Sequence, residues 1–159
     1  TTMKPIQSLA ALAVSLALAL GAPAIAAAET SSHDGHGAAA LELALNNGAK
    51  WKGDQSMIDG MSAIRAAMVA NLGAVHDGSL TAEGAKSLAA DVQKQVDFMV
   101  ENCVLEPAVD EQLHAVLGGV LNGVGALEAG EVEPGAVAIV QALNAYGAHF
   151  EHPGWQDIE

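Results

Sequence analysis

Apolar residues recur every three or four positions from residue 55 onward, in four stripes separated by short breaker segments. This spacing is that of one face of an α-helix, and no segment shows the period-two alternation of a half-buried strand. Four helices with short connections predict an all-α, antiparallel up-down four-helix bundle. The expected core stripes are Met57, Met61, Ile64, Met68, Leu72 and Val75; Ala85, Leu88, Val92, Val96, Met99 and Cys103; Leu113, Leu117, Val120, Val124 and Leu127; and Val137, Val140, Leu143, Tyr146 and Phe150.

Start and stop signals give the predicted helices their limits. Asp54 and Thr81 are suited to cap helix N-termini, because each has a side-chain oxygen that can accept a hydrogen bond from the first turn. Pro107 and Pro134 favour a helix start, because the first turn needs no backbone donor from them. The helices are therefore expected at about 55–76, 82–103, 107–130 and 134–152, which makes 54–152 the bundle and 153–159 a C-terminal tail.

The third helical segment contains glycine at positions 118, 119, 123 and 125. Within a helix each glycine costs about 1 kcal/mol relative to alanine. That cost is tolerated where a neighbouring helix approaches closely or where something else fills the space. Close helix packing is the expected reason here.

The N-terminal residues have the pattern of a secretory signal peptide. Lys4 precedes an apolar run over 9–20, and alanines at 24, 26 and 28 form an A-x-A cleavage pattern. The apolar run is too short to span a bilayer comfortably. We therefore expect residues 1–28 to be removed on export to a periplasmic location, and residues 29–53 to form a flexible tail and lead-in.

The charge balance limits the partners that the protein can bind. Nineteen acidic residues against six basic ones give a formal net charge of −13 at pH 7. Such a surface disfavours nucleic acid and anionic lipid. It fits an exported protein that attracts metal cations or a basic redox or metallochaperone partner, with no membrane contact after signal cleavage.

One end of the expected bundle gathers most of the sulfur and imidazole side chains. In an antiparallel bundle the first and third helices begin where the second and fourth helices end, and the helix axis advances about 1.5 Å per residue. Thiolate and thioether favour Cu(I), while imidazole suits copper, zinc and haem iron, so copper is the expected metal. The candidate ligands at this end are Cys103, Met99, His114, Met57, Met61 and His149.

Each candidate ligand also has a plainer interpretation. Methionines at helical spacing commonly fill protein cores, and a histidine near a helix C-terminus stabilises the helix dipole without binding a metal. Cys103 is the single cysteine, so its thiol is buried, bound to metal or paired with another chain. His33 and His36 lie in the expected flexible tail, and His152 is expected to face water.

A methionine early in the first helix and a histidine late in the fourth lie in "QSMIDGMSAIR" and "NAYGAHFEH". This arrangement resembles the small periplasmic four-helix-bundle cytochromes, which include the soluble b-type cytochrome and the cytochrome c-prime family. The resemblance implies a haem at one bundle end, with Met61 or Met57 and His149 as axial ligands. The chain has no C-x-x-C-H motif, so covalent haem attachment is excluded.

The sequence contains no G-x-S-x-G or H-E-x-x-H motif, and we expect no enzymatic activity. The first functional hypothesis is an exported soluble bundle that sequesters or transfers copper or another soft transition metal. The second is a non-covalent haem protein that carries electrons. The third is an interaction module without a cofactor.

Overall fold

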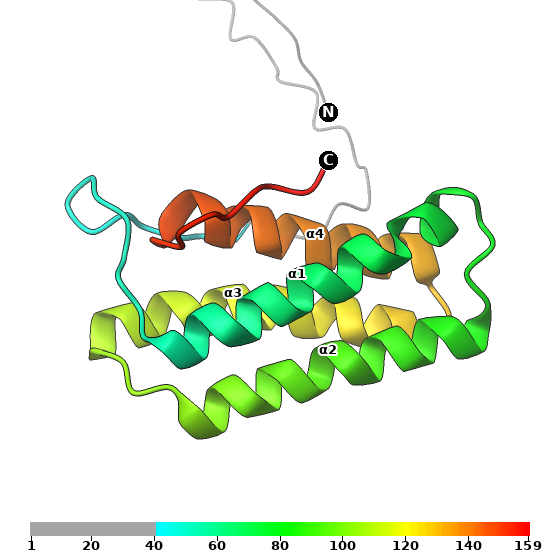
Figure 1. Cartoon of the computed structure of the whole chain (residues 1–159), viewed down its shortest axis with the longest axis horizontal. Coiled ribbons are helices and arrows are strands. Elements are labelled where there is room, and N and C mark those ends of the chain that lie inside the picture. The colour runs from blue at the N-terminus through cyan, green and yellow to red at the C-terminus, as the bar shows by residue number, and fades with distance from the viewer. Residues whose placement is uncertain (1–40) are drawn as a thin grey trace, which may run out of the picture. The chain divides into compact units, whose positions relative to one another are not determined.

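The computed structural model describes residues 41–159, so the expected signal peptide and the tail histidines lie outside the described residues. The chain forms four helices: α1, Gln55–His76; α2, Ala82–Asn102; α3, Pro107–Glu128; and α4, Val132–His149. α1 and α3 each pack against both α2 and α4 (Figure 1). Residues 41–159 form no strand, only two isolated bridge pairs, so the predicted all-α four-helix class is confirmed. No helix in this part of the chain is long and apolar enough to cross a membrane.

The helix N-termini follow the local signals closely. The Asp54 carboxylate caps α1 and the Thr81 hydroxyl caps α2, each accepting a hydrogen bond from a first-turn N–H group. Pro107 begins α3 as predicted. α4 begins at Val132 rather than at Pro134, because a proline within the first turn removes no intrahelical hydrogen bond.

The core follows the predicted stripes, with an error at the start of α4. The stripes of α1, α2 and α3 are buried, apart from the partly exposed Leu72 and Cys103. On α4, Leu143, Tyr146 and Phe150 are buried as expected and Val140 is partly buried. Val137 is 46% exposed, and Ala136 and Ile139 are buried in its place. Much of the buried face of α4 consists of glycine and alanine, and the spacing of large apolar residues does not reveal the burial of such small residues.

α3 and α4 approach each other closely at a pair of glycines. A Cβ atom added to Gly123 would lie 2.7 Å from the Gly135 carbonyl oxygen, and one added to Gly135 would lie 2.8 Å from the Gly123 carbonyl oxygen. A Cβ atom added to Gly119 would lie 3.2 Å from the Ala142 Cβ of α4 and 3.0 Å from the Leu41 side chain. Close helix packing therefore explains Gly119 and Gly123, as expected from the sequence.

The segments before α1 and after α4 are hydrogen-bonded to each other and to α4. The Trp51 N–H donates to the His149 carbonyl, and the Glu151 N–H donates to the Trp51 carbonyl, both at 2.8 Å. Further along, the Asn144 side chain forms two hydrogen bonds of 2.9 Å with the backbone of Ile158, whose side chain is buried. The end of α4 is thus enclosed by chain from both sides.

Candidate functional site

Asp54 joins two parts of the chain at one end of the bundle. One carboxylate oxygen accepts a hydrogen bond from the Met57 N–H at 2.8 Å, and the other accepts from the Val104 N–H at 2.7 Å. The Cys103 side chain lies beside this carboxylate and interacts with it. Burial by itself raises the pKa of Asp54, but these hydrogen bonds together lower it below its ordinary value. Asp54 therefore stays ionised and holds the start of α1 against the end of α2.

The Cys103 thiol lies just after α2, half-buried at this junction. Burial raises the pKa of the thiol to about 12, and the negative charges of Asp54 and Asp110 add to the shift. At neutral pH the side chain is therefore a protonated thiol rather than a reactive thiolate. A metal ion that binds the sulfur has to displace this proton.

Three thioethers lie in the core beside this junction. Met57, Met61 and Met99 are at most 1% exposed. Gly60 lies between Met57 and Met61 along α1, and a Cβ atom added to it would be 2.7 Å from the Met99 sulfur. The Met99 thioether from α2 thus packs on the turn of α1 that carries the other two methionines. These three side chains fill the core, as the plainer interpretation holds. Together with Cys103 they make four sulfur-containing residues at one bundle end.

The two candidate histidines are bonded to their own helices. His114 Nδ1–H donates to the Asp110 carbonyl at 2.9 Å, and His149 Nδ1–H donates to the Ala145 carbonyl at 2.8 Å. His114 has a side chain that is 66% exposed, whereas His149 is half-buried. A carbonyl acceptor at Nδ1 leaves Nε2 of a neutral imidazole available, which is the usual second-shell arrangement of a metal-binding histidine. Within residues 41–159, no group of three or more His, Cys, Asp or Glu side chains is arranged to hold a metal ion.

His152 was expected to face water but is half-buried at the same end. Its Nδ1 lies 3.0 Å from the Tyr146 hydroxyl, and its Nε2 lies 3.1 Å from the Ser62 hydroxyl. Burial lowers the pKa of His152, while the Asp59 carboxylate opposes that shift. Burial also raises the pKa of Tyr146, whose ring stacks on Phe150. No sequence signal pointed to the pairing of His152 with Tyr146. The chain reverses its direction beyond α4, and this reversal brings the imidazole against the tyrosine.

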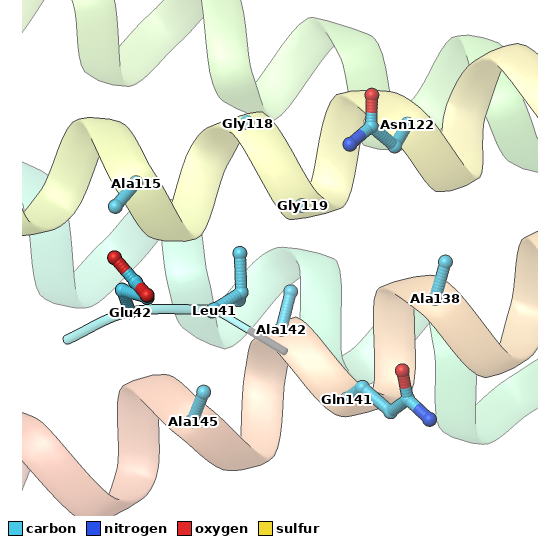
Figure 2. A pocket seen from close by; sticks show the side chains of 10 residues that line it. All are labelled: Leu41, Glu42, Ala115, Gly118, Gly119, Asn122, Ala138, Gln141, Ala142 and Ala145. Carbon is cyan, nitrogen blue, oxygen red and sulfur yellow. The ribbon is translucent and has the colours of Figure 1, made fainter. Parts of the chain in front are cut away.

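A separate groove of about 750 Å³ runs between α3 and α4. Figure 2 shows Leu41 and Glu42 lying in it, with small side chains of both helices on either side. None of the six candidate ligands lines this groove. The groove is thus a feature distinct from the sulfur-rich bundle end.

Comparison with protein-family models, with curated proteins and with solved structures found no match to this chain. The resemblance to the four-helix-bundle cytochromes therefore extends to the all-α, four-helix architecture alone. The structure brings Cys103, Met57, Met61 and Met99 to one bundle end. The two imidazoles lie near the same helix ends but bond within α3 and α4.

Proposed function

We propose that the chain is an exported, antiparallel up-down four-helix bundle that binds Cu(I), or another soft transition metal, at the end where Asp54 and Cys103 meet. Its role would be to sequester or transfer the metal rather than to catalyse a reaction. The proposal rests chiefly on the hydrogen bond from the Val104 N–H to Asp54, which holds the neighbouring Cys103 beside the methionine-bearing turns of α1. Sulfur donors select Cu(I) over hard cations such as Mg²⁺ and Ca²⁺.

The six candidate ligands would play different roles in metal binding. Cys103 would be the anchoring ligand, because a thiolate is the one soft anionic donor among them. Met99, Met57 and Met61 would supply neutral thioethers, and the free Nε2 atoms of His114 and His149 could complete a set of three or four ligands. Burial of the thioethers suits a soft ion that is bound away from water. A basic redox or metallochaperone partner would then be attracted by the net charge of −13.

A competition titration against a Cu(I) chelator under reducing conditions tests this function. Cys103→Ser and Met99→Leu should each weaken Cu(I) binding, the serine variant by at least about a hundredfold. Met68→Leu is the matched control, because Met68 is also fully buried but belongs to the middle of α1. The double variant His33→Ala with His36→Ala should bind as the parent does. The proposal fails if Cys103→Ser binds as tightly as the parent, or if only the tail variant loses affinity.

Non-covalent haem is the second candidate cofactor, favoured only by the methionine near the start of α1 and the histidine at the end of α4. The residues present do not fit it well. Met57 and Met61 are fully buried in the packed core, and the groove between α3 and α4 contains neither of them nor His149. An absorption spectrum of the purified protein with a Soret band would favour haem over copper.

A further inference from the structure

The chain has a single tyrosine, Tyr146, and its side chain is fully buried in the bundle. Among residues 41–159, the phenol hydroxyl has one hydrogen-bond partner, the Nδ1 atom of His152 at 3.0 Å. The other ring nitrogen of His152, Nε2, lies 3.1 Å from the hydroxyl of Ser62, an exposed residue of α1. Tyr146, His152 and Ser62 thus form one hydrogen-bonded chain that leads from the core to the surface.

The burial of the phenol determines the direction of these hydrogen bonds. A neutral imidazole carries one N–H group, at either Nδ1 or Nε2. If Nδ1 carried it, the Tyr146 hydroxyl would accept that hydrogen bond, and its own proton would be buried without an acceptor, which costs free energy. With the N–H group at Nε2, the Tyr146 hydroxyl donates to Nδ1 and Nε2 donates to Ser62. Burial lowers the pKa of His152, so the imidazole is neutral at pH 7 and Nδ1 has a lone pair that can take a proton.

Tyr146 is also in contact with the surface through Trp155. The two rings meet edge to face with their centroids 4.9 Å apart, and Trp155 is partly exposed. Loss of an electron from a phenol or an indole leaves a strongly acidic radical cation, so a neighbouring base that takes the proton makes the oxidation easier. The indole N–H of Trp155 has no hydrogen-bond partner within residues 41–159, and that of Trp51 donates to the Ala44 carbonyl. Of the tyrosine and the two tryptophans, only Tyr146 therefore has a basic side chain within hydrogen-bond distance.

The charges around these side chains favour a positive charge on His152 over one on Trp155. The Asp59 carboxylate acts on His152 and stabilises its protonated form. The Arg65 guanidinium lies 5.9 Å from the centre of the Trp155 ring and is held there by a hydrogen bond of 2.6 Å from its Nε to the Gln156 carbonyl. A cation beside the ring disfavours an indole that has lost an electron. An electron taken from Trp155 is therefore replaced from Tyr146.

We propose that Tyr146 is a redox-active tyrosine, which a one-electron oxidant beside Trp155 converts into a neutral tyrosyl radical while His152 takes the phenol proton. In this step the O–H bond of Tyr146 breaks, an N–H bond forms at Nδ1 of His152, and one electron leaves through Trp155 to the oxidant. The products are the radical, an imidazolium ion and the reduced oxidant, and reduction of the radical returns the proton to the phenol. The net charge of −13 favours a cationic oxidant. The proposal does not depend on copper binding, because none of these side chains is among the six candidate ligands.

Photochemical oxidation of the full chain, freed of metal by a chelator, tests the proposal. A cationic ruthenium(III) polypyridyl complex, generated by a laser flash, is the oxidant, and transient absorption and electron paramagnetic resonance follow the products. The parent should give a tyrosyl radical, which can arise only at Tyr146 because the chain has no other tyrosine. This radical should form more slowly in heavy water than in ordinary water, because a proton moves together with the electron.

His152→Gln keeps a hydrogen-bond acceptor for the phenol but removes the base, so the rate of radical formation should fall at least about a hundredfold. His76→Gln is the matched control, since His76 is an exposed histidine in the last turn of α1 and makes no contact with Tyr146. This control should form the radical at the rate of the parent. Circular dichroism of both variants should be that of the parent.

The absence of a tyrosyl radical in the parent, or a tryptophan radical in its place, would overturn the proposal. So would equal rates in the parent and His152→Gln, the result expected if His152 only satisfies a buried hydroxyl group, or an equal loss of rate in His76→Gln. If His152→Gln does not fold, the parent alone decides, because equal rates in ordinary and heavy water would exclude a proton transfer coupled to the oxidation.

Discussion

The pH dependence of Cu(I) affinity follows directly from the state of Cys103. The thiol has a pKa of about 12, so it remains protonated from about pH 7 to about pH 10. A Cu(I) ion that binds the sulfur must release this proton, and its affinity should rise about tenfold, or about 1.4 kcal/mol, for each pH unit. The total gain over the range is about a thousandfold.

An unperturbed cysteine would behave differently over the same range. With a pKa of about 8.5 it is largely thiolate above pH 9, so the affinity gain from about pH 7 to about pH 10 would be only about thirtyfold. The difference between a continuous rise and a plateau thus reports whether Asp54 and burial hold the proton on Cys103. Asp54→Asn keeps an N-cap but removes the negative charge, so it should raise the Cu(I) affinity at pH 7 and flatten the curve at high pH.

The assay is a chelator competition run at several pH values on the parent, Asp54→Asn, Cys103→Ser and Met99→Leu. Met99→Leu should lower the Cu(I) affinity by the same factor at every pH, because a thioether has no proton to lose. In Cys103→Ser the Cu(I) affinity should no longer rise with pH. A plateau in the parent near pH 9 would refute the perturbed thiol, and an unchanged slope in Cys103→Ser would refute its role as a ligand.

Further predictions concern stability, measured by urea or thermal unfolding. Asp54→Ala should destabilise the fold by about 2–3 kcal/mol, because it removes the α1 cap and the hydrogen bond from Val104. Gly118→Ala should stabilise the fold by about 0.5–1 kcal/mol, whereas Gly123→Ala should destabilise it, since only the second Cβ would meet the backbone of α4. His152 has a lowered pKa, so its neutral form contributes stability above about pH 6.5 that is lost as the pH falls below this value. His152→Gln should reduce the loss of stability at acid pH. An unchanged pH dependence of the free energy of unfolding in this variant would show that His152 does not cause that loss.

The helical architecture could be predicted because its signals are local. Capping by Asp54 and Thr81, the proline at the start of α3 and the three- and four-residue spacing are all properties of neighbouring positions. The start of the α4 stripe, at Val137, was wrong for a related reason. Its buried face is built largely from alanine and glycine, whose burial depends on how closely α3 approaches and not on their own hydrophobicity.

The gathering of Cys103, Met57, Met61 and Met99 at one bundle end could be predicted from helix length and direction, but their contacts could not. Asp54 was recognised as a helix cap, yet its hydrogen bond from Val104 joins residues 50 positions apart and exists only in the folded chain. The protonated state of the thiol depends on those contacts as well. The placement of His152 against Tyr146 depends on the course of the chain beyond α4, which residue spacing does not determine.

The metal content and absorption spectrum of the protein, purified anaerobically from the cells that produce it, test the proposed function most directly. We expect about one copper ion per chain, a colourless Cu(I) protein and loss of that copper in Cys103→Ser. A Soret band, or the same copper content in Cys103→Ser as in the parent, would contradict it.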